Sequence, residues 1–359
     1  MIKCDKPIIY LGFNDPRVHV RGVENVIRLQ SHATTGRKYY IFRGTHPECF
    51  CWGDFIAISI SMNYFTSFFL LRTLLKRIEK RHGTPIVHAH QYLLAVLVIT
   101  RCMIFTVHDA LGYHKKHVGS KSLWLFKIIE WIVYLKAQKI HAISHFAWNN
   151  AAGSDAFKSK VSIIYNSTWS STDEMYDLEN RFGDGPGYYL VVRSIEERAN
   201  FNLIFNFAKQ LQQEKNSIKI KIVGKGPKLN EYRDMAKQQD LTNIEFLGYV
   251  DDDALNVLYY NSVCVIMPAL YGEGFGLPLI EAYARGIPAI GSSVCAVPEV
   301  IYAEDLLFDN DVYSLTKAVQ QALKVDRNKF REYFQEKFER NKIIFLYVNL
   351  YKSLQVPRP

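Results

Sequence analysis

Two glutamates, Glu273 and Glu281, stand eight positions apart in the segment 271–286, YGEGFGLPLIEAYARG. Three glycines alternate along its first half, and glycine lets a backbone approach a ligand closely because no side chain blocks it. A proline follows where a first helical turn accepts one, and a helix start offers unpaired N–H groups and a partial positive charge. This combination is typical of a phosphate site. Carboxylates beside a phosphate are unfavourable unless they bind something else, and sugar hydroxyls are the obvious donors to them.

A plainer interpretation is a tight turn between a strand and a helix whose acids are merely solvated. A glycine motif alone favours that interpretation, because short motifs match by chance. Here the glycines, the proline and both acids agree on an anion site. We therefore favour a site in which one glutamate holds a transferred sugar and the other holds the ribose of a nucleotide.

The elements that must position this segment are a strand, a helix and a second strand. The apolar run 263–267, closed by Pro268, predicts a buried parallel strand; the helix ends at Gly286, and 287–290 predicts the next strand. Similar alternation along the chain predicts open α/β sheets, in which ligands bind at the carboxyl ends of the strands.

The stretch EGFGLPLIEA, residues 273–282, resembles the E-x7-E signature of the retaining glycosyltransferases of family 4, the "glycosyl transferases group 1", of the kind that makes bacterial polysaccharide and lipopolysaccharide. The whole chain can be laid over that family's order of motifs. The resemblance implies the GT-B fold, which has two Rossmann-like doubly wound domains, a cleft between them and a C-terminal helix that crosses back.

The resemblance also implies roles for charged residues. Glu273 orients the hydroxyls of the transferred sugar, and Glu281 holds the ribose. Arg193 and Arg198, after the predicted strand 189–192, stand where the family has an Arg-x4-Lys pair that supplies cations to the diphosphate. Arginine in place of lysine keeps the charge and gains bidentate reach. The alternative for this stretch is a set of surface salt bridges, which its place at the end of a strand disfavours.

Three histidines follow predicted strands. By the resemblance, His108 faces the donor sugar and ranks above His88 and His90. Three histidines could suggest zinc, but the family needs no metal, so we expect neither a metal site nor a cofactor besides the nucleotide-sugar substrate. The remaining predicted donor-binding residues are Gly274, Phe275, Gly276 and Leu277 in the central loop, and Gly22, Gly224, Tyr249 and Val250 elsewhere. The loop before Gly22 departs from the family, since Arg21 replaces the first of two glycines.

The length of 359 residues predicts roughly two domains of about 150 residues each. We expect an acceptor-side domain at 1–170, a polar linker at 171–187 and a nucleotide-sugar-binding domain at 188–330. The tail 331–359 is expected to return to the first domain. A long helix is predicted over 330–354.

Charge is divided unevenly between the halves. Residues 1–170 hold 22 Lys and Arg against 9 Asp and Glu, a balance of +13, and the remainder holds 22 against 26, a balance of −4. No recognition helix, zinc framework or aromatic RNA-binding motif accompanies the basic half, so we expect no nucleic-acid partner; an anionic membrane surface or a phosphate-bearing acceptor fits better. Basic residues from Lys115 to Lys127, beside Trp124 and Phe126, indicate an interfacial surface. A loop and a buried helix explain them equally well.

The chain begins without the basic, apolar and small-residue order of a signal peptide, and its six scattered cysteines are expected to be reduced. The most apolar window, 55–71, is interrupted by polar residues and falls short of a membrane span. We expect a cytoplasmic protein in peripheral contact with the inner face of the plasma membrane.

Taken together, these features predict a retaining, metal-independent hexosyltransferase that moves a sugar from a nucleotide sugar to a glycan or lipid-linked glycan in cell-surface polysaccharide synthesis. The main alternative is a non-catalytic nucleotide-sugar-binding partner of a glycan assembly complex. A Rossmann-type oxidoreductase is disfavoured because no G-x-G-x-x-G follows the first strand. A GT-B epimerase would need a catalytic carboxylate pair that we do not find. The resemblance and the lack of an obvious covalent nucleophile favour a front-face mechanism over double displacement.

Overall fold

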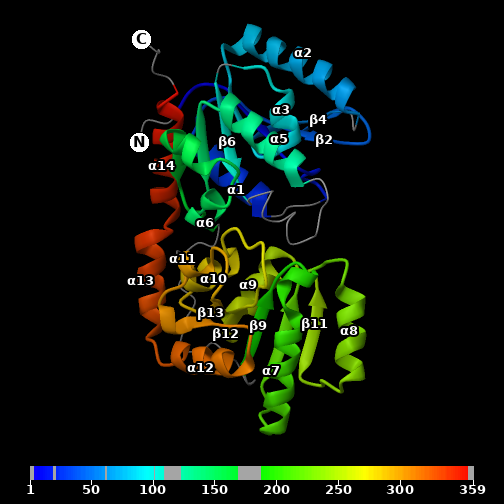
Figure 1. The fold of residues 1–359 in the computed structure, drawn as a ribbon, viewed down its shortest axis with the longest axis vertical. Helices are drawn as coiled ribbons and strands as arrows, with labels where there is room; N and C mark the ends of the chain where they lie inside the picture. Colours follow the sequence, from blue (N-terminus) through cyan, green and yellow to red (C-terminus); the bar gives the residue numbers. More distant parts are fainter. Residues whose placement is uncertain are drawn as a thin grey trace. The chain divides into compact units, whose positions relative to one another are not determined.

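The structure, a computed structural model, describes residues 4–18, 22–60, 63–100, 102–108, 123–168 and 187–354. The chain forms two compact units, one of Met1–Ser167 with Arg340–Pro359 and one of Thr168–Glu339. Each unit is a parallel α/β sheet covered by helices, so the predicted pair of Rossmann-like domains is confirmed (Figure 1). The expected linker 171–187 lies outside the described residues except for Gly187.

The first unit contains an eight-stranded sheet in the order β3-β4-β2-β1-β5-β6-β7-β8. Neighbouring strands are parallel except β3, which runs antiparallel to β4 at one edge. The sequence did not predict β3, because an edge strand with mostly exposed side chains has no apolar run. The strands are β1 (Ile8–Leu11), β2 (Lys38–Arg43), β3 (Glu48–Trp52), β4 (Phe55–Ile60), β5 (Ile86–Ala89), β6 (Met103–Val107), β7 (Lys139–Ala142) and β8 (Val161–Ile163).

The helices of the first unit cover both faces of its sheet. The step from β1 to β2 runs along the sheet in one direction, and the steps from β5 to β6 and β7 run in the other. Because such crossovers are right-handed, α1 lies on one face and α3 and α5 lie on the other. Helix α2 contacts α3, and α14 contacts α1. The helices are α1 (Gly22–Ser31), α2 (Tyr64–His82), α3 (Tyr92–Leu97), α5 (Leu123–Lys136), α6 (His145–Asn149), η1 (Ser154–Lys160) and α14 (Arg340–Lys352).

Helix α14 is fixed to the first unit by two buried tyrosines. The hydroxyl of Tyr351 lies 3.1 Å from the hydroxyl of Tyr10 and 2.9 Å from Nδ1 of His88. The hydroxyl of Tyr347 lies 3.3 Å from Nε2 of His141. These contacts join the end of the chain to strands β1, β5 and β7.

The second unit contains a six-stranded, all-parallel sheet in the order β11-β10-β9-β12-β13-β14. The chain moves outward from β9 through β10 to β11, and then returns to place β12 on the other side of β9. In an open α/β sheet, ligands bind where the strand order reverses in this way, beyond the carboxyl ends of the strands. The strands are β9 (Tyr188–Val192), β10 (Lys219–Val223), β11 (Ile244–Gly248), β12 (Ser262–Met267), β13 (Ala289–Ser292) and β14 (Leu307–Phe308).

Two expectations about the second unit need correction. The strand after Gly286 begins at Ala289, two residues later than expected. The single helix expected at 330–354 is two helices, α13 and α14, which separate at Phe338 and Glu339. Phe338 is fully buried against Phe275 and Tyr333, so its side chain holds the end of α13 in the second unit. The helices are η3 (Glu197–Ala199), α7 (Phe201–Gln213), α8 (Leu229–Gln238), α9 (Asp252–Tyr260), α10 (Leu277–Ala284), α11 (Val297–Val300), η4 (Glu304–Leu306), α12 (Val312–Ala322) and α13 (Arg327–Lys337).

Among the helices that the structure describes, none is both long and apolar enough to cross a membrane.

Candidate functional site

The glycine loop joins β12 to α10, as the sequence predicted. Its backbone passes through the left-handed region at Gly272, with φ 68°, and at Gly276, with φ 105°. Only glycine adopts these angles at little cost. Helix α10 begins at Leu277 with Pro278 in its first turn, and its N-cap residue, Gly276, has no side chain that could cap the N–H groups of that turn. The helix start is therefore open to an anion, as expected from its dipole.

Glu273 in this loop is paired with Arg193. Nη2 of Arg193 lies 3.0 Å from Oε2 of Glu273, and the two side chains are only 6% and 18% exposed. Arg193 follows β9 and Glu273 follows β12, and these strands are neighbours in the sheet. Nη1 of Arg193 is buried and has no hydrogen-bond partner among the residues that the structure describes. Burial lowers the pKa of Arg193 and the carboxylate of Glu273 raises it. The two opposite charges lie together, largely shielded from water, at the point where the strand order reverses.

Arg198 lies near the same edge and holds the loop. Its Nη1 donates to the carbonyl oxygen of Gly272 at 2.5 Å, and its Nε donates to Oε2 of Glu196 at 3.1 Å. The salt-bridge interpretation of this stretch therefore applies to Arg198, while Arg193 pairs with the distant Glu273. The two predicted cations and the glycine loop come together at one edge of the sheet.

Glu281 on α10 is held by Tyr259, a residue that the sequence analysis missed. The buried hydroxyl of Tyr259 donates to Oε2 of Glu281 at 2.6 Å. Burial and the nearby carboxylate raise the pKa of Tyr259, which keeps its proton on the hydroxyl. The guanidinium of Arg285 lies 4.7 Å from the centroid of the Tyr259 ring, and its Nη1 donates to the backbone oxygen of Glu281 at 2.6 Å. Arg285 was detectable in the sequence, since it stands four residues after Glu281, at the end of the same helix; Tyr259 had no such signal.

The other predicted residues of this unit have mixed positions. A Cβ on Gly224 would lie 1.8 Å from the backbone oxygen of Arg193, so this glycine lets the ends of β9 and β10 approach each other. Tyr249 and Val250 follow β11, and Nζ of Lys225 lies 4.4 Å from the centroid of the exposed Tyr249 ring. Most of the predicted donor-binding residues of this unit therefore lie along the carboxyl edge of its sheet. Asp251 caps α9 by accepting from the N–H of Ala254 at 2.8 Å.

In the first unit, His108 follows β6 and is half-buried. Its Nε2 lies 2.8 Å from Nδ1 of His90, which is fully buried. Burial lowers the pKa of His108 to about 3, so its ring is neutral at pH 7. The expectation that His88 lies at the end of a strand is wrong: it sits within β5, bonded to Tyr351 and, at 2.7 Å, to Oγ1 of Thr106. His88 is a satisfied core residue.

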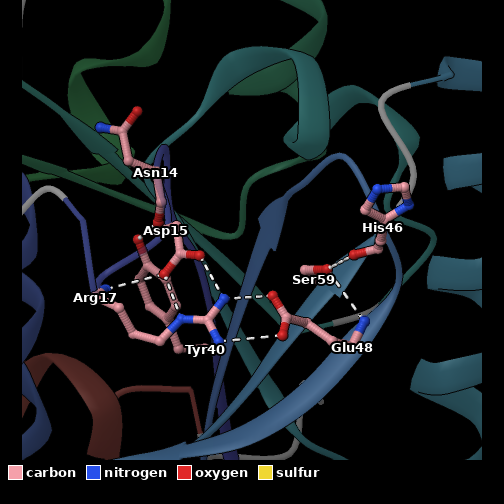
Figure 2. Close-up of polar contacts among 7 residues, drawn as sticks. All are labelled: Asn14, Asp15, Arg17, Tyr40, His46, Glu48 and Ser59. Carbon is pink, nitrogen blue, oxygen red and sulfur yellow. Dashed lines mark hydrogen bonds and ion pairs between the residues drawn. The ribbon is translucent and has the colours of Figure 1, made fainter.

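The loop after β1 is tied to the edge strand β3 (Figure 2). Nε of Arg17 donates to Oδ1 of Asp15 at 3.0 Å, and its Nη1 donates to Oε2 of Glu48 at 3.1 Å. The hydroxyl of Tyr40 donates to the backbone oxygen of Asn14 at 2.9 Å. The two acids raise the pKa of Arg17 and compensate its charge, so this arginine is a tether within the unit.

Gly22 opens α1 and is exposed, while Arg21 lies outside the described residues. Most of the predicted interfacial segment, residues 109–122 with Lys115, Lys116 and Lys121, also lies outside them. Among the residues that the structure does describe, no group of three or more His, Cys, Asp or Glu is arranged to hold a metal ion.

Residues 175–340 match the model of the family described as "Glycosyl transferases group 1". A segment of 84 residues is 40% identical to the O-antigen chain mannosyltransferase B of Escherichia coli, and covers 23% of this chain and 22% of that protein. An uncharacterized 41.2 kDa protein in the cps region of Klebsiella pneumoniae is 22% identical over 70% of this chain and 71% of its own length. The O-antigen chain mannosyltransferase C of Escherichia coli is 26% identical over 47% of both chains. The chain thus spans about a fifth of the first of these relatives and under half of the third.

Solved structures resemble the whole chain. Sucrose-phosphate synthase from Thermosynechococcus elongatus superimposes with a TM-score of 0.77 at 19% identity, covering 98% of this chain and 99% of that one. Anabaena HepE, solved in complex with UDP and glucose, superimposes with a TM-score of 0.74 at 14% identity, covering 96% and 99%. At these identities the likeness shows the fold, which is GT-B. The family model covers residues 175–340, which include EGFGLPLIEA, so the second unit carries the signature of the glycosyl transferases group 1 that the sequence indicated.

Proposed function

We propose that this protein transfers a hexose from a nucleotide-sugar donor to a glycan or lipid-linked glycan, with retention at the anomeric carbon and without a metal, in the synthesis of a cell-surface polysaccharide. The observation that carries the proposal is the buried pair of Arg193 and Glu273, which stands beside the open start of α10. The names of the mannosyltransferase relatives and the UDP bound to HepE support this class of donor and product.

The nucleotide half of the donor is matched by positive groups. As the sugar leaves, negative charge develops on the diphosphate, and groups that are already positioned stabilise it best. Arg193, Arg198 and the N–H groups at the start of α10 supply this stabilisation. Glu281, fixed by Tyr259, offers its second carboxylate oxygen to the ribose hydroxyls.

The sugar half of the donor is assigned to Glu273. In the free protein its carboxylate balances the charge of Arg193. When a diphosphate binds the guanidinium as well, Glu273 is free to accept a hydrogen bond from a sugar hydroxyl. In a front-face transfer, the bond from the anomeric carbon to the diphosphate breaks as the bond to the acceptor oxygen forms. The acceptor's proton passes to the departing diphosphate oxygen. The neutral ring of His108 is proposed to hydrogen-bond the donor sugar.

A lipid-linked acceptor requires the enzyme to work at a membrane surface, and we propose an anionic inner leaflet as that surface. A non-catalytic nucleotide-sugar-binding partner remains the second candidate. It is favoured by the engagement of Glu273 with Arg193, since a carboxylate that stays paired would hold a nucleotide without turning over the sugar.

Transfer of label separates the two candidates. Purified protein is incubated with radiolabelled UDP-glucose and GDP-mannose in turn, together with bacterial membrane lipids, and the label in the lipid extract and in soluble glycan is counted. If the protein is an enzyme, label should be transferred from one of the donors. This transfer should persist in EDTA and be lost in Glu273→Gln. Saturable nucleotide-sugar binding with no transfer from a wider panel of donors would favour the binder, and a strict need for Mg²⁺ or Mn²⁺ would contradict the metal-free account.

A further inference from the structure

Helix α5 is apolar on both of its faces. Its inner face buries Val133 and Tyr134 completely against the sheet. Its outer face exposes six large apolar side chains at helical spacing: Trp124, Leu125, Ile128, Trp131, Ile132 and Leu135. Trp124 is 64% exposed and Leu135 is 57% exposed, at opposite ends of this stripe. A helix on the surface of a water-soluble domain normally carries polar residues on its outer face, and a helix that is apolar all round is normally covered.

The neighbouring helices also expose apolar side chains. Helix α2 exposes Phe65, Phe69 and Leu70 in its first half, and Leu93 and Ile99 are exposed on α3 and just after it. Helix α3 contacts both α2 and α5, and the three form one layer on the sheet (Figure 1). Eleven of the twenty large apolar side chains exposed in the described part of the chain lie on this layer. Apolar side chains gathered on one helical layer in this number point to an interaction site.

The charge of the layer indicates what covers it. The second half of α2 exposes five cations: Arg72, Lys76, Arg77, Lys80 and Arg81. Within α2, α3 and α5 as described, Glu79 is the exposed acid, since Glu130 is buried and accepts from the N–H of Ala152 at 3.0 Å. Apolar side chains beside a cluster of cations complement the acyl region and the phosphates of an anionic bilayer.

The dimensions exclude a spanning arrangement for α5. Its 14 residues measure about 21 Å at the usual rise, short of a hydrocarbon core of about 30 Å. An apolar helix of this length lies in the plane of the interface, with its outer stripe toward the acyl chains.

We propose that the outer face of α2, α3 and α5 docks in the plane of an anionic bilayer, with the stripe of α5 in contact with acyl chains and the cations of α2 on lipid phosphates. The inference rests on the proposed function for its purpose, the delivery of a lipid-linked acceptor. It does not rest on transfer for its test, because vesicle binding is measured without donor or acceptor. Loss of transfer with intact vesicle binding would overturn the function and leave the docking face in place.

The test is co-sedimentation of the full chain with vesicles of phosphatidylcholine alone or with about one third phosphatidylglycerol. The apolar variant combines Trp124→Ser, Ile128→Ser and Leu135→Ser. Its matched control combines Phe345→Ser and Leu346→Ser, two exposed apolar residues of α14, which packs on the α1 side of the sheet. The basic variant combines Lys76→Gln, Arg77→Gln and Lys80→Gln. Its control replaces three exposed lysines of the second unit by glutamine: Lys209, Lys215 and Lys237.

We expect wild type and both controls to bind the anionic vesicles but not those of phosphatidylcholine alone. The apolar variant should lose binding to the anionic vesicles. Each basic residue near an anionic surface is worth about fivefold in affinity at low salt, so the basic variant should bind about a hundredfold more weakly. The fluorescence of Trp124, taken as the difference between wild type and Trp124→Phe, should be quenched by lipids brominated on their acyl chains. Wild-type binding by the folded apolar variant would overturn the proposal. The proposal would also be overturned if the wild type were an oligomer and the apolar variant a monomer with unchanged vesicle binding. The face would then be a protein interface.

Discussion

The two units share an architecture and differ in where they keep their charge. The first unit holds 26 Lys and Arg against 9 Asp and Glu, and the second holds 18 against 26. The basic first unit has a group of histidines in and beside its core that bond to one another, to Thr106 and to tyrosines of α14. The acidic second unit has a buried ion pair, Arg193 with Glu273, at the edge where its strand order reverses.

This difference separates two tasks. A cation that is buried beside a carboxylate is costly to desolvate. We propose that the pair in the second unit offsets this cost when it binds a diphosphate. In the first unit the cations are exposed on helices such as α2, where they are suited to a large anionic surface.

As the pH falls, the first unit should lose stability before the second. Of the effects predicted here, we expect this one to be the largest. All eleven histidines lie within residues 1–167. Burial lowers the pKa of His141 to about 4 and of His108 to about 3, and it also lowers the pKa values of His88 and His90. These rings are neutral when folded, and the unfolded chain takes up protons below about pH 6.5. The stability is therefore complete above that pH and is lost as the pH falls below it, by about 1.4 kcal/mol per pH unit for each such histidine.

Hydrogen–deuterium exchange, resolved by peptide, measures this asymmetry. Between pH 7.5 and 5.5, and after correction for intrinsic exchange, strands β5 to β7 should lose protection while β9 to β12 keep theirs. A matched comparison at pH 8.5 and 7.5 should show no change in either unit. Equal losses in both units at pH 5.5 would refute the assignment of buried neutral histidines to acid sensitivity.

Removal of the buried cation should have the next largest effect. Arg193→Ala should lower turnover by about 10²–10³, the usual loss when one preorganised electrostatic group is removed. The control is Arg233→Ala, which removes a half-buried arginine of the same unit that donates to the backbone oxygen of Phe246 at 3.2 Å. Turnover within threefold of wild type for Arg193→Ala, when measured beside a folded Arg233→Ala, would remove Arg193 from the diphosphate site.

Tyr259→Phe should have a smaller effect on the same site. The variant keeps the ring beneath Arg285 and removes the hydrogen bond to Glu281, so nucleoside diphosphate should bind about tenfold more weakly while kcat changes little. Tyr283→Phe is the matched control, because this buried tyrosine of α10 donates to the backbone oxygen of Ala289 at 3.1 Å. Calorimetric titration of both variants checks the difference, and an equal loss of affinity in the two would assign Tyr259 a purely structural role.

The sequence predicted those parts of the molecule that local pattern controls. Helix α2 is set by local pattern, because the apolar positions repeat at helical spacing between Asn63, whose side chain accepts from the N–H of Phe65, and Gly83, whose φ of 80° ends the helix. The glycine loop before α10 was predicted because its special backbone angles require glycine. These features depend on neighbours within one or two turns.

The contacts that complete the site could not be read in this way. Arg193 and Glu273 are 80 positions apart and meet only because β12 is placed beside β9. Tyr259 reaches Glu281 from another helix, and β3 has no apolar run because it lies at an exposed edge. The sequence wrongly predicted His88 at the end of a strand. Its true position within β5 depends on the register with β1, which no local pattern specifies.

The central claim is that the second unit divides the donor between two glutamates, with Arg193 shared between Glu273 and the diphosphate. It is tested most directly by measuring nucleoside-diphosphate affinity and sugar transfer for Glu273→Gln and Glu281→Gln side by side, with the nucleotide of the donor that wild type uses. Glu273→Gln should lose transfer by about 10² or more yet bind the nucleoside diphosphate as tightly as wild type or more so, because Arg193 no longer shares its charge with a carboxylate. Glu281→Gln should weaken that binding. Wild-type transfer by Glu273→Gln, or weakened diphosphate binding by Glu273→Gln with unchanged binding by Glu281→Gln, would contradict the account.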